Sequence, residues 1–346
     1  MPLSSILPDA GAPQIKEIDP SAAIPGGEVQ IYGDHLSAVA YRLPVVMLGD
    51  LAAPVLLSRE ERMSIRVPDE AESGALRVLR NGAQSNSVNV KVARMVGNEV
   101  HMVASPVMDE EGRVYGTFSG ARGQETPVSV LRTGNDGELQ PFVRGIMNAT
   151  GMALDPAGFL YVSSRHEGTV YRVSPNGATS VYAEGMGVAT GIAFDGEQNL
   201  YVGDRSGTIF KIAPDRQIFV YATLEPSVAA YHLAFGQEGT LYVSVPTTSG
   251  HDCVYAIDSD GSAAPHYRGL GRPQGLAVDI AGDVYVVASL RGRQGVVRLP
   301  QDGEPSLVVA GQDLVGFSFT PQGTALLATS SAIYDVDLGI EGWRVV

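Results

Sequence analysis

The chain has 346 residues, a net charge of −14 and hydrophobic residues at 44% of its positions. This length predicts two domains, and the composition excludes a disordered or fibrous chain. The acidic charge disfavours nucleic acid and anionic lipid as partners, so no nucleic-acid or membrane partner is expected. Cys253 is the only cysteine, which excludes an intrachain disulfide and a thiolate metal cluster.

The N-terminal part of the chain, residues 12–93, has the pattern of short, half-buried strands. Val29 and Ile31, and later Val88 and Val90, alternate with polar residues, and turns separate such runs regularly. This pattern predicts a small antiparallel sandwich of the immunoglobulin-like class, with about seven strands. Residues 1–16 lack the basic start and apolar core of a secretory signal, which predicts a cytoplasmic protein, or an exported one whose signal was removed.

Residues 13–36, PQIKEIDPSAAIPGGEVQIYGDHL, resemble the opening of an IPT/TIG domain. The shared features are a proline before the first strand, a Pro-Gly-Gly turn and a glycine after the second strand. Gly49, Gly74 and the pair Ser85-Asn86 agree with the same pattern further along the chain. Domains of this family are usually interaction or spacer modules, so the resemblance implies that role for residues 12–93.

Beyond a boundary near residues 94–98, one sequence element recurs with a period of about 40 residues, which indicates a repeat architecture. The element reads Gly-apolar-Ala-apolar-Asp, then a glycine-containing turn, then apolar-Tyr-Val. It is clearest as TGMALDPAGFLYVS at 150–163 and TGIAFDGEQNLYVG at 190–203. The six anchor residues, with spacings of 46, 40, 41, 43 and 41, are Tyr115, Tyr161, Tyr201, Tyr242, Tyr285 and Leu326.

Each repeat continues with a third strand, a polar turn and a fourth strand. Four short strands in a unit of about 40 residues predict a blade, so residues 99–346 are predicted to form a six-bladed β-propeller in an all-β chain. The aligned aspartates are expected to begin tight turns in which the carboxylate accepts hydrogen bonds from nearby amides. These aspartates are Asp109, Asp155, Asp195 and Asp279.

The closing strand of the ring is predicted separately. Residues 343–346 have the pattern of an outer strand for the last blade, and residues 99–103 could add beside it. Either arrangement would protect an exposed sheet edge.

The repeats resemble those of NHL-repeat proteins and of the gluconolactonase and regucalcin (senescence marker protein) family. The resemblance to the second family implies one divalent cation in the channel, held by Glu, Asn and Asp side chains that mostly directly precede the inner strands. None of the matching residues is a carboxylate: they are Ala104, Thr150, Thr190, Tyr231, Gln274 and Val315. Neutral side chains bind a hard cation poorly, so we expect no metal cofactor; Asn148 is a weak candidate ligand for Ca²⁺ or another divalent cation.

The same strand starts are expected at the mouth of the channel. Thr150, Thr190, Tyr231 and Gln274 would form a neutral, hydrogen-bonding rim there, and His232 replaces the usual blade glycine. The loops between second and third strands should open onto this face. Their polar residues are Arg122, Arg165, His166, Asp204, Arg205, His251, Asp252, Arg291 and Arg293. Arginine forks suit carboxylate or phosphate, which predicts a small polar or anionic ligand, or a peptide; the alternative is a solvated face with local ion pairs.

The sequence therefore predicts a ligand- or protein-binding β-propeller with a polar channel-mouth site formed by Thr150, Thr190, Tyr231, His232, Gln274, Arg165, Arg205 and Arg291. The alternative is a lactone hydrolase of the gluconolactonase type with a divergent or metal-containing site. A third reading is a structural module of a larger assembly. Neither a GxSxG elbow nor an HExxH motif occurs, so no catalytic residue is assigned.

Overall fold

The computed structural model describes residues 11–247 and 249–344. The chain forms two compact units: the first consists of the residues up to Arg94 together with Leu307–Gln312, and the second of the remainder. In the part of the chain that the structure describes, the only helical element is a single 3-10 turn at Gln237–Gly239. The prediction of an all-β chain is therefore confirmed. No helix among the described residues is long and apolar enough to cross a membrane.

The first unit contains two groups of paired strands. One is a four-stranded sheet in the order β1 (Gln14–Asp19), β3 (Glu28–Asp34), β7 (Arg62–Arg66) and β6 (Val55–Ser58). The other follows the order β2 (Ala22–Ala23), β10 (Val88–Val92), β8 (Gly74–Arg80), β4 (Val45–Leu48) and β5 (Leu51–Ala53), and β9 (Ala83–Gln84) pairs with β8.

The core of this unit follows from the period of two along each strand. In β3, Val29 and Ile31 are buried while their neighbours are half-buried, so one face of the strand points into the core. The core also takes in Ala310, which pairs in parallel with Ala23. This short segment belongs, in chain order, to the repeats, and no feature of the sequence indicated that it joins the N-terminal unit.

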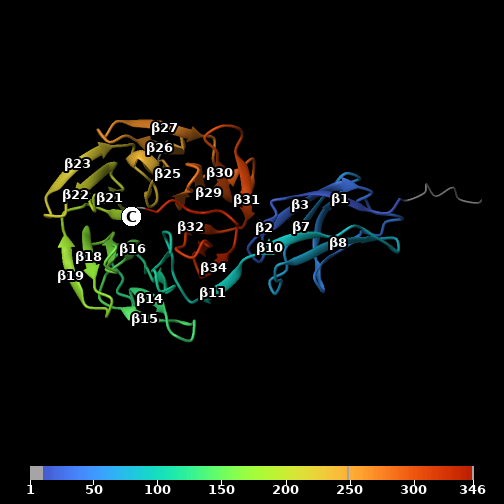
Figure 1. The fold of residues 1–346 in the computed structure, drawn as a ribbon, viewed down its shortest axis with the longest axis horizontal. Coiled ribbons are helices and arrows are strands. Elements are labelled where there is room, and N and C mark those ends of the chain that lie inside the picture. The colour runs from blue at the N-terminus through green and yellow to red at the C-terminus, as the bar shows by residue number, and fades with distance from the viewer. Residues whose placement is uncertain (1–10, 248, 345–346) are drawn as a thin grey trace, which may run out of the picture. The chain divides into compact units, whose positions relative to one another are not determined.

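In the second unit the sheets are arranged in a ring (Figure 1). The first two four-stranded sheets run outward as β12 (Val107–Met108), β13 (Val114–Thr117), β14 (Val130–Thr133) and β15 (Leu139–Val143), then β16 (Ala149–Leu154), β17 (Leu160–Ser164), β18 (Thr169–Val173) and β19 (Thr179–Ala183).

Two further four-stranded sheets continue the ring in chain order. They are β20 (Ala189–Phe194), β21 (Leu200–Asp204), β22 (Thr208–Ile212) and β23 (Ile218–Thr223), then β24 (His232–Phe235), β25 (Leu241–Val245), β26 (Cys253–Ile257) and β27 (Ala263–Arg268).

The remaining strands complete the ring. They are β28 (Leu276–Val278), β29 (Val284–Leu290) and β30 (Arg293–Leu299), then β32 (Leu314–Phe319), β33 (Ala325–Thr329), β34 (Ala332–Val336) and β11 (Arg94–Asn98). From Leu307 on, β31 (Ser306–Ala310) belongs to the first unit, where Ala310 pairs with Ala23.

The last sheet corrects the expected closure of the ring. Its outer strand is β11, from the start of the unit, and neither residues 343–344 nor residues 99–103 fill that position. Instead, the amide of Trp343 donates to the carbonyl of Val278 at 2.7 Å, so the C-terminal segment lies beside the inner strand β28. Gly342 makes this path possible, because a Cβ there would lie 2.1 Å from the Cβ of Phe319. Residues 345 and 346 lie outside the described part of the chain.

The aspartate turns are confirmed, and they explain the tyrosine of the repeat. Asp155 Oδ1 accepts hydrogen bonds from the amides of Ala157 and Phe159 at 3.0 and 2.9 Å, and Oδ2 accepts one from the Tyr161 hydroxyl at 3.2 Å. Asp109, Asp195 and Asp279 likewise accept from Tyr115, Tyr201 and Tyr285. Burial, and next the charge of Asp155, raises the pKa of Tyr161 to about 12, so the phenol stays a donor. In these four repeats a hydrogen bond thus joins the inner turn to its own second strand.

Candidate ligand-binding cavity

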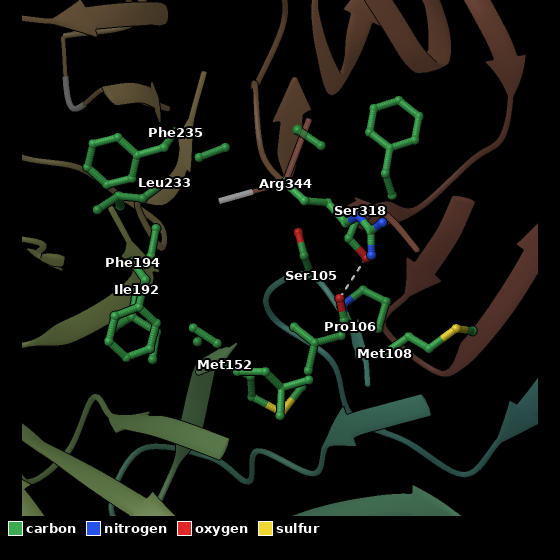
Figure 2. A pocket seen from close by; sticks show the side chains of 18 of the residues that line it. Ser105, Pro106, Met108, Met152, Ile192, Phe194, Leu233, Phe235, Ser318 and Arg344 are labelled. Carbon is green, nitrogen blue, oxygen red and sulfur yellow. Dashed lines mark hydrogen bonds between the residues drawn. The ribbon is translucent and has the colours of Figure 1, made fainter. Parts of the chain in front are cut away.

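The inner strands of the second unit enclose a cavity of about 730 Å³ (Figure 2). Its wall runs along the whole length of these strands, from Gly151, Gly191 and His232 at their starts to the turn Asp155–Gly158 at the other end. We call the end at the starts of the inner strands the loop end, because the connections between the second and third strands lie there. We call the opposite end the turn end, because the aspartate turns lie there.

Close contact between neighbouring inner strands narrows the loop end. A Cβ on Gly151 would lie 2.3 Å from the carbonyl oxygen of Thr190, and one on Gly191 would lie 2.2 Å from that of Tyr231. Only glycine permits this approach of two backbones, which is the physical reason for the glycine that begins the repeat. His232 holds the same position in its own strand and is buried on the cavity wall.

Most of the wall is apolar. Its larger side chains include Met152, Ile192, Phe194, Leu233 and Phe235, which Figure 2 shows around the space. Two serines also line the cavity: Ser318 donates to the carbonyl of Pro106 at 2.7 Å, and Ser105 accepts from the amide of Phe317 at 3.2 Å.

His232 differs from the serines, because its imidazole has no hydrogen-bond partner among the described residues. Burial lowers its pKa to about 4, so the ring is neutral near pH 7. A neutral imidazole carries one donor and one acceptor nitrogen, and here both remain available to a molecule in the cavity. His232 is thus a buried, neutral polar group of the cavity wall whose hydrogen-bonding capacity is unused.

At the turn end, the C-terminal segment contributes Trp343 and Arg344 to the wall. Arg344 reaches the turn of the first sheet and forms an ion pair with Glu110 at 3.3 Å between Nη1 and Oε1. Figure 2 shows the Arg344 side chain beside Ser318. No local pattern indicated that these two residues line a cavity, since they follow the last repeat and their position depends on pairing with β28.

Three predicted rim residues are placed elsewhere than expected. Thr150 and Thr190 are 1% exposed and Tyr231 is fully buried, so none of them borders an open mouth. Thr190 Oγ1 donates to the carbonyl of Gly203 at 2.8 Å and accepts from the amide of Tyr231 at 3.1 Å. Thr150 donates to the carbonyl of Asn148, and the Tyr231 hydroxyl donates to that of Glu225. The polar groups of these residues are thus engaged within the protein, in Thr150 by a residue of its own repeat and in Thr190 also by the neighbouring blade.

Asn148 is also structural. Its amide group donates to the carbonyls of Gly120 and Ala121 at 2.8 and 2.9 Å, and its oxygen accepts from the amide of Gly123 at 2.8 Å. The side chain thereby fixes this loop and does not fit the role of metal ligand. In the described residues, no group of three or more His, Cys, Asp or Glu could hold a metal ion. The residues at the expected cation position therefore do not fit a hard cation.

The remaining predicted residues lie at different places. Gln274 is half-buried, and its backbone carbonyl accepts from the Ser244 hydroxyl at 2.6 Å. Arg291 occupies the tight turn between β29 and β30 with φ of 52°, and it pairs with Glu304, so it belongs to an exposed hairpin. Arg165 and Arg205 follow β17 and β21 directly, at the loop end of two neighbouring sheets.

No protein-family model and no curated protein matches this chain. Solved structures do match. A protein provisionally described as a gluconolactonase has 21% sequence identity and a TM-score of 0.60, covering 73% of this chain and 93% of that one. An auxiliary nutrient binding protein from Bacteroides ovatus has 12% identity and a TM-score of 0.55, covering 94% and 97%.

A catalytically inactive virginiamycin B lyase from Staphylococcus aureus, crystallised with quinupristin, has 11% identity and a TM-score of 0.53, covering 96% of this chain and 97% of that one. At these identities the likeness concerns the fold alone. Together with the ring of sheets, it identifies the second unit as a β-propeller.

Proposed function

We propose that this chain is a small-molecule-binding β-propeller protein whose ligand occupies the central cavity. The observation that carries the proposal is the cavity itself. Its volume of about 730 Å³ is in the range of small-molecule sites, and its apolar wall with a few polar groups has their usual character. The occurrence of a nutrient-binding protein among the structural neighbours is consistent with this role.

The wall indicates the chemistry of the ligand. An uncharged organic molecule with an apolar face would cover Ile192, Phe194 and Leu233, while a hydroxyl or carbonyl group would pair with the neutral ring of His232. A charged group is disfavoured deep in the cavity, since no counter-charge lies there to offset its dehydration. Arg344 and Glu110 place charges only at the turn end.

We also propose the finer fold assignments. The six groups of strands that follow one another around the described ring support six blades, in agreement with the repeat spacing. The two groups of paired strands in the first unit, with one core between them, support an immunoglobulin-like domain of the IPT/TIG type. The domain limits 12–93 and 99–346 belong to the same proposal.

The test uses three uncharged probes: glucose, glucono-δ-lactone and phenyl β-glucoside. We expect phenyl β-glucoside to raise the melting temperature most, because its ring buries apolar area that glucose lacks. His232→Phe should weaken its binding at least tenfold in calorimetry. His266→Phe is the matched control, since His266 lies on the outer strand β27 and packs on Tyr242. Absence of any shift, or equal binding by both variants, would contradict the proposal.

A lactone hydrolase is the second candidate, and His232 is the observation that favours it. A neutral imidazole on the cavity wall can accept a proton from an attacking water, although a pKa of about 4 makes it a weak base. Hydrolysis of glucono-δ-lactone in a pH-stat, above the spontaneous rate and lost in His232→Phe, would establish this activity. Adding EDTA separates a metal-dependent reaction from one that uses the imidazole alone.

A further inference from the structure

Three arginines gather at the loop end of three successive sheets. Arg165 follows β17 and Arg205 follows β21, while Arg122 lies in the connection between β13 and β14. Among the described residues, none of the three forms a salt bridge, although the chain carries 38 acidic side chains. Arginines elsewhere in the ring do find carboxylates, as Arg113 finds Asp109.

Two of these arginines, Arg165 and Arg205, donate hydrogen bonds to neutral backbone oxygens. Arg165 Nη2 donates to the carbonyl of Gly120 at 2.9 Å, and Arg205 Nη2 donates to that of Val228 at 2.9 Å. The loop that supplies Gly120 and Arg122 is in turn fixed by Asn148, whose amide binds Gly120, Ala121 and Gly123. The arginines are therefore positioned by the fold while their charges stay uncompensated.

Arg165 also has an unsatisfied donor, as Arg77 and Arg172 do elsewhere in the chain. Its Nε is buried and has no hydrogen-bond acceptor, although a buried donor without a partner costs about 1–3 kcal/mol. Burial, and next the charges of Arg205 and Arg122, lower the pKa of Arg165. An acceptor with negative charge placed here would satisfy the donor and relieve the repulsion together.

We propose that Arg122, Arg165 and Arg205 form a binding site for the oxyanion of a small molecule, a carboxylate or a phosphate. Guanidinium forks donate two parallel hydrogen bonds to either group, which favours arginine over lysine for this task. The site lies at the end of the blade strands opposite Arg344, and it does not depend on the function proposed for the central cavity. Arg291 is not part of it, because that side chain pairs with Glu304.

The experiment is isothermal titration calorimetry of the full chain with sodium phosphate, sulfate and acetate, at constant ionic strength set with chloride. We expect wild-type binding of at least one of these anions and at least tenfold weaker binding by Arg165→Gln. Phosphate and sulfate binding without acetate would identify a tetrahedral oxyanion, and acetate binding would identify a carboxylate.

Arg122→Gln serves as the second variant, because Arg122 is exposed and has no hydrogen bond among the described residues, so its loss does not endanger folding. It should weaken binding several-fold. Arg144→Gln is the control matched to Arg165→Gln. Like Arg165, Arg144 donates to one backbone carbonyl, that of Pro127, but it lies outside the cluster. The anion affinity of Arg144→Gln should stay within twofold of wild type. The proposal is overturned if wild type binds none of the anions more tightly than chloride, or if Arg165→Gln and Arg122→Gln bind like Arg144→Gln.

Discussion

Two pairs of arginines, one at each end of the blade strands, have different partners, although Arg291 at the loop end also pairs with a carboxylate, that of Glu304. At the turn end, Arg113 meets Asp109 and Arg298 meets Asp283, with Nε to carboxylate oxygen distances of 2.6 Å in both pairs. At the loop end, Arg165 and Arg205 are held only by backbone carbonyls. A compensated arginine contributes to the fold, whereas one held by neutral oxygens keeps its charge available to a ligand. The difference separates a structural end from a candidate binding end.

The largest expected effect comes from removing one turn carboxylate. Asp279 is buried and accepts hydrogen bonds from the amides of Ala281 and Asp283 and from the Tyr285 hydroxyl. Asp279→Ala leaves three donors without an acceptor, so we expect a loss of about 3 kcal/mol in the free energy of unfolding by urea. Asp215→Ala, in an exposed turn between β22 and β23, is the control and should change stability little. Equal losses of unfolding free energy in the two variants would show that the buried aspartates do not stabilise the turns.

The second effect is the pH dependence of stability that arises from His232, which lies at the loop end of the cavity. The pKa of His232 is about 4 in the folded chain, against 6.5 for a free side chain, so the unfolded chain binds the extra proton first. Stability should therefore fall as pH drops through 6.5 toward 4, by about 2 kcal/mol at pH 5 from this residue. In His232→Phe this contribution is absent, and urea unfolding at pH 7 and pH 5 measures the difference. Parallel pH profiles for wild type and variant would contradict the assignment.

The third effect compares the arginines directly. Arg298→Gln removes the charged partner of the buried Asp283 side chain, which should cost about 1.5 kcal/mol. Arg122→Gln removes a charge that repels Arg165 and should leave stability unchanged or slightly raised. Urea unfolding of both variants at low and high salt is the measurement. A similar loss in both would remove the distinction between the two ends.

The smallest effect concerns the C-terminal segment at the turn end. Gly342→Ala introduces a Cβ within 2.1 Å of the Phe319 Cβ, so the segment must shift away from β28 at a cost of about 1 kcal/mol. Arg344→Ala, which removes only an exposed ion pair with Glu110, should cost less than about 0.5 kcal/mol. Thermal unfolding distinguishes them, and identical melting temperatures would mean that the segment does not depend on this packing.

The local turns and strands of the propeller follow from the residues of a single repeat. The aspartate, the glycine turn and the tyrosine lie within one repeat, so their spacing predicted both the short strands and the hydrogen-bonded turns that the structure shows. The same spacing indicated which residues begin the inner strands. It did not reveal that Thr150 is buried or that Thr190 accepts a hydrogen bond from the next blade, because both depend on how the repeats pack.

The composition of the cavity and of the arginine cluster depends on contacts between distant parts of the chain. Arg344 reaches the cavity because Trp343 pairs with Val278, and Ala310 joins the core of the first unit because it pairs with Ala23; each contact links residues far apart in the chain. The uncompensated charge of Arg165 likewise depends on the absence of a nearby carboxylate, which no local pattern encodes. The sequence period predicts the structure within one repeat, whereas burial, strand pairing and charge balance depend on contacts between repeats.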